Sequence, residues 1–243
     1  MKTNLANYTL FVLLLLILNN LKAQPGCTDP LASNYNHLAA QNDGSCVYSA
    51  ATISAGTSVQ LPAIMQETSG LIFWNNRLWT HNDDSDINLY AFDTNAVNIF
   101  EAYALTGTAN IDWEEISQDS AYIYVGDFGN NVNGNRTNLK ILRIEKNTLL
   151  THAPIIDTIA FAYANQTDFS PTGGNNTDFD CEAFIVTTDS IYLFTKQWVS
   201  QKTALYVLPK TPGNHLAQYK TTLDVQGLVT GAVYLENANL VVL

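Results

Sequence analysis

The chain has 243 residues, of which 11 are basic and 22 acidic, giving a formal net charge of −11 at pH 7. This charge and the lack of any basic cluster exclude a protein that follows the phosphate backbone of nucleic acid, and they disfavour binding to anionic lipid. P-loop, C-x-x-C, G-x-S-x-G and H-E-x-x-H motifs are absent from the sequence, and there is no nucleotide, flavin or haem signature.

Residues 1–23 have the pattern of a signal peptide. Lys2 provides a positive start, residues 10–18 form an apolar run, and Ala23 precedes the expected cleavage point. Nine apolar residues are too few to cross a bilayer, which takes about 20. We therefore expect export to the cell exterior or the outer cell surface, with no transmembrane segment after cleavage.

Residues 24–48 form a small unit bracketed by Cys27 and Cys46. Because an exported protein meets an oxidising environment, we predict a disulfide between these two cysteines. Closing such a loop stabilises the fold by about 3 kcal/mol in the chain-entropy account. Cys181, the third cysteine, falls in a predicted strand and is expected to be a small buried apolar residue rather than a nucleophile.

The same unit resembles a short cysteine-bracketed module of secreted and surface proteins of Bacteroidota. The resemblance rests on its GCTDP, ASNYN and NDGSCVY segments. Closely spaced oxygen-bearing side chains, including Asp29, Asn34 and Asp43, suggest a calcium loop. Asx, Gly and Pro residues also form ordinary turns, so both interpretations are kept. Residues 49–66 are expected to be a linker or an initial strand.

Residues 67–243 repeat one strand register four times. In each copy an apolar anchor is followed seven residues later by an apolar pair that opens the next strand. The pairs are Leu71 with Leu78-Trp79, Ile116 with Ile123-Tyr124, Phe184 with Ile191-Tyr192, and Val233 with Leu240-Val241. A further strand follows in the first three copies, so we predict at least three-stranded antiparallel meanders.

A repeat period in the forties is typical of β-propellers. The interval around residues 165–177 is longer and polar, which predicts a loop insertion. We therefore predict an all-β fold, a β-propeller of four-stranded antiparallel blades, with about three and a half blades in residues 67–243. Since the fourth copy stops inside its second strand, the sequence is expected to be a C-terminally truncated fragment that folds poorly alone.

Acidic residues recur at one position of this repeat. The alignment places Glu67, Asp112 and Asp180 in one column, and Ser69, Glu114 and Glu182 in another column two residues further on. Residues i and i+2 of a regular strand share a face. If the first strand of each blade lines the channel, the two pairs converge at its mouth, where they would hold a cation or raise each other's pKa.

A second polar column lies at the strand exits. It contains His81, Asn82, Asp83 and Asp84 in the first copy, Asp127 in the second, and Thr195 and Lys196 in the third. We treat Glu114, Glu182, Asp127 and Asn82 as candidate calcium ligands, and Asp112, Asp180, His81 and Lys196 as candidate ligand-binding residues. The alternative for Asp127 is a turn role, with the following Gly129 at positive φ.

Two tryptophans, Trp113 and Trp198, flank the proposed channel mouth, where an exposed ring could stack on a sugar. The alternative is that they need no ligand. Trp79 falls in an interior strand position and is expected in the core.

These motifs together resemble the secreted propellers grouped loosely with phytase-like and NHL-type proteins. The segments that carry the resemblance are SGL at 69–71, LWTHND at 78–83, DWEEI at 112–116, GDFGNN at 126–131 and EAF at 182–184. The resemblance implies a six-bladed propeller, often joined in Bacteroidota to a C-terminal domain for type IX secretion. Cys181 departs from the small residue, usually Ala, expected between Asp180 and Glu182.

Two functions are compatible with this sequence. The first is a non-catalytic secreted propeller that binds an extracellular ligand or a cell-surface partner and is stabilised by calcium. The second is a calcium-dependent hydrolase of phosphoesters or lactones, with the metal at the channel mouth. A phosphatase would require several cations at the site, and Lys196 is the one basic residue that the alignment places near the acidic columns.

Overall fold

The structure, a computed structural model, describes residues 24–50, 52, 54, 56, 58–83, 85–93 and 95–243. The proposed signal peptide at residues 1–23 lies outside the described residues. The chain divides into two compact units, Met1–Ser58 and Val59–Leu243. Within the described residues, no helix is both long and apolar enough to cross a membrane.

The first unit is small, and backbone hydrogen bonds, side-chain to backbone hydrogen bonds and a disulfide hold it together. Strands β1 (Pro25–Gly26) and β2 (Gln41–Asn42) pair in parallel. The predicted disulfide between Cys27 and Cys46 is confirmed. Asn34 closes the loop further, because its side chain donates to the carbonyl of Ser45 and accepts from the amide of Val47.

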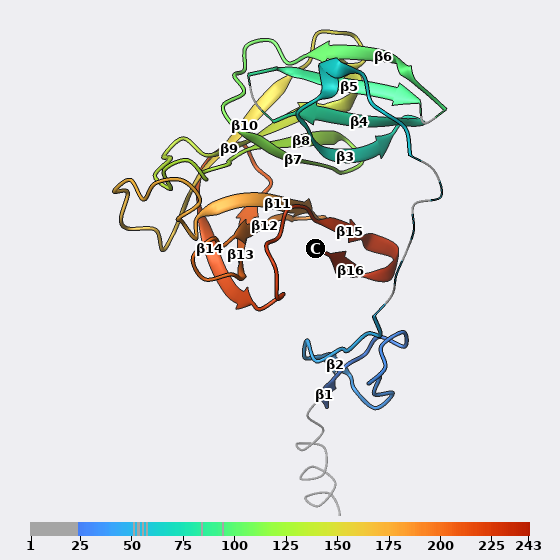
Figure 1. The fold of residues 1–243 in the computed structure, drawn as a ribbon, viewed down its shortest axis with the longest axis vertical. Helices are drawn as coiled ribbons and strands as arrows, with labels where there is room; N and C mark the ends of the chain where they lie inside the picture. Colours follow the sequence, from blue (N-terminus) through green and yellow to red (C-terminus); the bar gives the residue numbers. More distant parts are fainter. Residues whose placement is uncertain are drawn as a thin grey trace, which may run out of the picture. The chain divides into compact units, whose positions relative to one another are not determined.

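The second unit is all-β and contains three consecutive four-stranded antiparallel meanders (Figure 1). A 3-10 turn, η1 (Ala63–Met65), precedes the first meander. That meander consists of β3 (Thr68–Trp74), β4 (Arg77–Asn82), β5 (Asn88–Asp93) and β6 (Ala96–Ala104).

The second meander consists of β7 (Trp113–Gln118), β8 (Tyr122–Asp127), β9 (Lys140–Glu145) and β10 (Ile156–Tyr163). A short helix, α2 (Lys146–Leu149), follows β9. The third meander consists of β11 (Asp180–Val186), β12 (Ser190–Lys196), β13 (Thr203–Pro209) and β14 (Gly213–Leu223). The chain then forms β15 (Val233–Leu235), the 3-10 turn η2 (Glu236–Ala238) and β16 (Leu240–Val242).

The strands therefore begin where the seven-residue register predicts, and each of the first three copies gains a fourth strand. One strand pairing would not occur if the meanders were separate antiparallel blades. Strand β10 pairs in parallel with β14, from Ile159 opposite Gly213 to Tyr163 opposite Ala217. This ladder joins the second and third meanders into one eight-stranded sheet. The sheet is nearly closed, because its two edge strands, β7 and β11, lie against each other.

The core lies between the meanders. One buried cluster, which includes Trp79, Trp113 and Ile123, joins the first meander to the second, while another, which includes Phe128 and Phe184, joins the second to the third. The prediction that Trp79 is a core residue is confirmed, since it is fully buried. Strand β7 contacts both β3 and β11, so the first strands of the three meanders are neighbours.

Candidate metal centre

Each of these three first strands contains a β-bulge, at the same aligned position in β7 and β11 and one to two residues later in β3. The pairing with the second strand shifts between Ser69 and Ile72 in β3, between Trp113 and Glu115 in β7, and between Cys181 and Ala183 in β11. Glu114 and Glu182 are the extra residues of the last two bulges. A bulge removes a residue from the ladder and redirects its side chain, and bulges are frequent beside functional sites.

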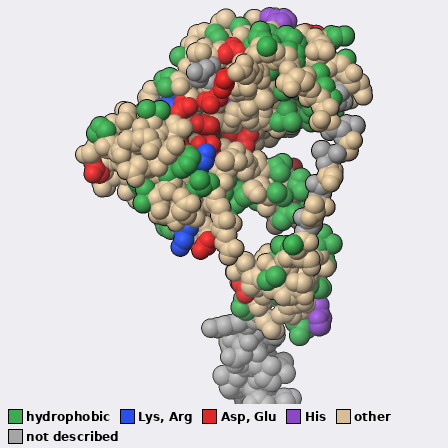
Figure 2. Space-filling model, viewed as in Figure 1, with side chains coloured by type: hydrophobic (Ala, Val, Ile, Leu, Met, Phe, Trp, Pro, Cys, Tyr) green, Lys and Arg blue, Asp and Glu red, His purple; other side chains and the backbone are tan. Residues whose placement is uncertain are grey.

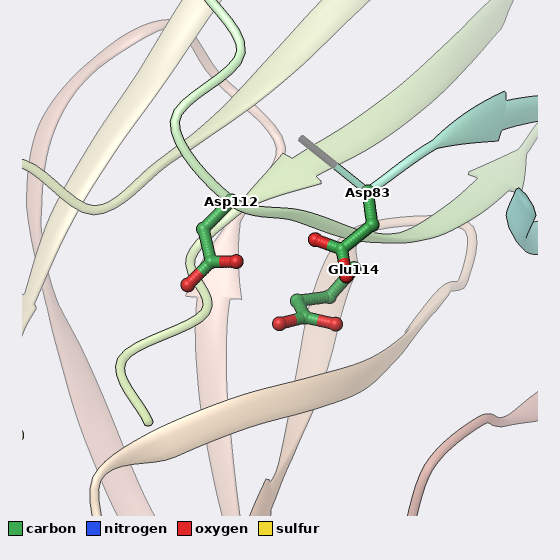
Figure 3. A group of neighbouring side chains, drawn as sticks. All are labelled: Asp83, Asp112 and Glu114. Carbon is green, nitrogen blue, oxygen red and sulfur yellow. The ribbon is translucent and has the colours of Figure 1, made fainter. Parts of the chain in front are cut away.

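The simple alternation assumed from the sequence is therefore wrong at these two positions. Nevertheless, each acid pair does come together. Carboxyl oxygens of Asp83, Asp112 and Glu114 lie within 4.8 Å of one another, as do those of Glu114, Asp180 and Glu182. In Figure 3 the side chains of Asp83, Asp112 and Glu114 point into the same space. Figure 2 shows acidic side chains gathered at a hollow of the surface. We call these five residues the acidic cluster.

The members of the cluster on β11 have partners. Asp180 accepts hydrogen bonds from the indole Nε1 of Trp198 at 2.8 Å and from the backbone amide of Asn130 at 2.6 Å. Glu182 forms an ion pair with Lys196, whose Nζ lies 3.0 Å from Oε1. Because the ammonium of Lys196 also lies 4.5 Å from the ring centre of Trp198, that ring face is covered. Trp113 is fully buried, which leaves no exposed ring for a sugar and agrees with the alternative that this tryptophan needs no ligand.

Gly129 forms a wall of the cluster without contributing a side chain. A Cβ at this position would lie 2.3 Å from Oε1 of Glu114 and 2.4 Å from Oδ2 of Asp112, which is closer than atoms can approach. Positive φ, which the sequence suggested, is not the reason for glycine here, because Gly129 is not among the glycines with positive φ. Close approach of the backbone to two carboxylates is the reason instead.

Burial and mutual repulsion raise the pKa values of the cluster. The pKa of Glu114 rises to about 10, mainly through burial and then through the charges of Glu182 and Asp112. The pKa of Asp112 rises to about 7 through burial and the charge of Asp83, against the opposing effect of Arg136.

The two acids of β11 shift in the same direction. The pKa of Glu182 rises to about 7 through burial and the charge of Asp180, although Lys196 opposes the change. The pKa of Asp180 is raised by burial, while its hydrogen bonds from Trp198 and Asn130 oppose the increase. The cluster therefore retains protons at neutral pH unless a cation compensates its charge.

The structure places two predicted metal ligands outside the cluster. Asp127 is fully buried and pairs with Arg136 and Lys140, each at 2.7 Å. The side chain of Asn82 donates to the carbonyl of Ile64 and to the carboxylate of Asp86. Both side chains hold neighbouring loops in place, which is the structural alternative to metal binding.

His81 is also placed in the interior. It is fully buried and its ring lies edge-on to Trp113, with the centroids 5.8 Å apart. Burial lowers the pKa of His81 to about 4, so the imidazole is neutral at physiological pH. Its Nδ1 is hydrogen-bonded to the carbonyl of Asn82 at 3.0 Å. The geometry therefore makes His81 a core residue of β4 rather than a member of the cluster.

Two residues at the site were not among the candidate ligands chosen from the sequence. Asp83, directly after β4, belongs to the polar column at the strand exits, but Asn82 beside it was chosen as the candidate instead. Arg136 reaches back from the loop after β8, donating to the carbonyl of Gly129 at 2.6 Å, and it lies 3.9 Å from Asp112. Nothing in the repeat marked Arg136, because its position in the loop has no counterpart in the other copies.

The oxygen-bearing residues of the first unit serve turns. Asp29 accepts from the amide of Leu31 and the hydroxyl of Tyr48, and Asp43 accepts from the amide of Ser45. With Asn34 bridging Ser45 and Val47, these three predicted calcium ligands are each engaged locally. In the described part of the chain, the groups of acidic side chains close enough to share an ion all belong to the acidic cluster.

A separate cavity of about 750 Å³ lies between the first meander and residues 230–243. Its lining is mainly apolar and includes Leu71, Phe92 and Val97. Glu115 is the acidic residue in its wall, and burial raises the pKa of Glu115 to about 7. Both oxygens of Glu115 already accept backbone amides, from Ile116 and Ala232. This cavity therefore offers apolar surface, whereas the acidic cluster contains the reactive groups.

Cys181, between the two acids of β11, is fully buried and not part of a disulfide. Burial raises the pKa of its thiol, so the thiolate is disfavoured. This confirms the prediction of a small buried residue.

Comparison with known protein families found no matching family, and comparison with curated proteins found no relative.

Proposed function

We propose that the meanders of the second unit are β-propeller blades and that this unit binds an extracellular ligand or a cell-surface partner through a calcium site. The support for a propeller is the series of four-stranded meanders whose first strands, β3, β7 and β11, lie next to one another. In a propeller such strands surround the central channel. We also propose that the chain is exported through the signal peptide at residues 1–23. Its resemblance to phytase-like and NHL-type propellers supports this proposal and suggests type IX secretion.

One observation supports the cation site above all others. Five carboxyl groups converge, from β7 and the residue before it, from β11 and from the exit of β4, although burial makes their negative charges unfavourable. Such an arrangement is costly unless a partner compensates it. The donors are oxygens only, which is the ligand set that Ca²⁺ prefers. The cysteine of β11 is buried and does not contribute a soft ligand.

The positions of two basic residues favour a hydrolase as the second candidate. Arg136 and Lys196 lie at Asp112 and Glu182. A cation in the cluster would polarise a substrate oxygen, and these side chains could contact an anionic ester group. A phosphatase would require several basic residues, and the sequence alone placed only Lys196 near the acids. Arg136 adds a second basic residue at the site. A panel of phosphoester and lactone substrates, assayed with calcium and with chelator, tests this candidate.

Thermal unfolding of residues 24–243 tests the cation site. Calcium at about 100 times its Kd should stabilise the chain by about 2.7 kcal/mol, which raises the Tm by about 5 to 10 °C. Glu114→Gln and Glu182→Gln should abolish that increase. Glu67→Gln is the matched control, because Glu67 is an exposed acid at the aligned position of the first copy. An unchanged Tm for the unmodified chain in calcium and in chelator would refute the proposal.

A further inference from the structure

The acidic cluster consists of two overlapping sets rather than one. Asp83 and Asp112 form one set with Glu114, and Asp180 and Glu182 form the other with the same Glu114. Within each set the oxygens lie within 4.8 Å of one another. Three carboxylates from each set could thus contact one ion. Glu114 is the residue that both sets share.

Glu114 also differs from its neighbours in its hydrogen bonding. Asp180 and Glu182 receive donors from Trp198, Asn130 and Lys196. By contrast, none of the described residues donates a hydrogen bond to the carboxyl group of Glu114, although the residue is only 8 % exposed. A residue this buried, whose carboxyl group receives no donor from the described part of the chain, is suited to an ion or water as its partner. This observation is independent of the clustering, and it places the missing partner at the centre of the two sets.

The balance of charges at the site also indicates a missing positive partner. The cluster contains five acidic groups, and the nearby cations are Lys196 and Arg136. Arg136 lies 3.9 Å from Asp112 but 2.7 Å from Asp127, so it compensates the cluster only weakly. If all five acids are ionised, the excess negative charge is larger than one divalent cation neutralises. Gly129 leaves the first set open to an ion, because it places no side chain against Asp112 or Glu114.

We propose that Glu114 bridges two divalent cations, one bound with Asp83 and Asp112 and the other with Asp180 and Glu182. This rests on the proposed function, and it extends a single calcium site to a two-ion centre. A carboxylate bridge holds each ion with a different oxygen, and ions in such centres lie about 3.5 to 4 Å apart. Water or a ligand oxygen would complete each coordination shell, since Ca²⁺ takes six to eight oxygens.

Electron paramagnetic resonance of residues 24–243 loaded with Mn²⁺ tests the bridge. Two bridged Mn²⁺ ions give an exchange-coupled spectrum, which an isolated ion elsewhere in the chain cannot produce. We expect Glu114→Gln to abolish the coupled spectrum. Asp83→Asn and Asp180→Asn should each convert it to that of an uncoupled ion, because one set remains. Glu67→Gln should leave it unchanged, and circular dichroism should verify that each variant is folded.

The outcomes separate this inference from the proposed function. Mn²⁺ that binds at the cluster, competes with Ca²⁺ and is lost in Glu114→Gln, but shows no coupling, would overturn the two-ion centre and leave a single-ion site. Failure to bind either ion at the cluster would overturn both. A coupled spectrum that persists in Glu114→Gln would also contradict the bridge.

Discussion

Asp127 and Glu114 are two buried carboxylates of the same meander with opposite surroundings. Asp127 lies at the end of β8, fully buried, with Arg136 and Lys140 each 2.7 Å from its oxygens. Glu114 lies in the bulge of β7, nearly as buried, among four other acids. A buried charge is stable when it is paired. Asp127 is compensated within the chain, whereas Glu114 depends on a partner from outside. The comparison thus separates a structural acid from a binding acid.

The largest expected effect is on the structural acid. Asp127→Asn leaves Arg136 and Lys140 without their buried partner and should lower the free energy of unfolding by about 3 to 5 kcal/mol. Urea unfolding in chelator measures this, with Glu114→Gln as the matched variant. Because the raised pKa keeps Glu114 protonated in the cation-free chain, Glu114→Gln replaces a neutral carboxyl group with a neutral amide of similar shape and should not destabilise that chain. Equal destabilisation of both variants would contradict the distinction between the two acids.

The next effect is the pH dependence of the cation-free chain. Asp112 and Glu182 have folded pKa values of about 7, above their ordinary values of 3.8 and 4.5. The folded state therefore binds more protons than the unfolded state between about pH 4 and pH 7. Stability is complete below that window and should fall as the pH rises through it. At about 1.4 kcal/mol per pKa unit the two changes would amount to about 8 kcal/mol, and solvent screening at these partly exposed carboxyl groups reduces the expected loss to about 3 kcal/mol.

The high pKa of Glu114, about 10, extends this decline into the alkaline range. Urea unfolding at pH 5, 7 and 9 in chelator measures the slope, and Glu114→Gln should reduce it at the alkaline end. Saturating calcium should flatten or reverse the slope, because the cation binds the ionised cluster. Stability that rises with pH in chelator would show that the acids are compensated without an ion.

A smaller effect is expected from filling the space beside Glu114. The Cβ of Gly129→Ala would meet the oxygens of Glu114 and Asp112 and displace them. We expect the stabilisation by calcium, about 2.7 kcal/mol at 100 times the Kd, to be lost although no ligand is changed. Isothermal titration calorimetry measures the binding. Gly174→Ala is the control, because a Cβ there meets no atom within 4 Å. Unchanged affinity in Gly129→Ala would refute the role of this wall.

The smallest effect is expected at Trp198. Trp198→Phe removes the 2.8 Å hydrogen bond to Asp180 but retains an aromatic ring beside Lys196. The loss should be about 1 to 2 kcal/mol in urea unfolding, because one charge-assisted hydrogen bond is removed. The pKa of Asp180 should rise further without its donor, which carboxyl-detected NMR titration can follow. A decrease in that pKa would contradict the assignment.

Much of the fold could be predicted from the sequence because its signals are local. The apolar pairs at Leu78, Ile123 and Ile191 mark second strands, and the two bracketing cysteines form the disulfide. The repeat also identified the acid pairs of β7 and β11. These features follow from side-chain alternation and spacing, which each copy expresses by itself.

What could not be predicted depends on contacts between copies. The parallel pairing of β10 with β14 joins two meanders across a long sequence separation. Arg136 reaches Asp127 through a loop specific to the second copy, which turns a predicted metal ligand into a paired structural acid. The bulges redirect Glu114 and Glu182, and a shift of one residue leaves no mark in an alternating pattern. Charge compensation is a property of three-dimensional neighbours.

The parallel ladder between β10 and β14 also determines which parts of the chain open together. Its backbone hydrogen bonds continue the second meander into the third, so amide protons in β8 and β12 should become accessible in a single cooperative event. In the strands that the structure describes, the first meander forms a sheet of its own, with no such ladder to the other meanders. It can separate as its own foldon, and native-state hydrogen exchange would then give β4 a lower opening free energy than β8. Asp83 would leave with that foldon, while Glu114 and the acids of β11 stay together on the remaining one.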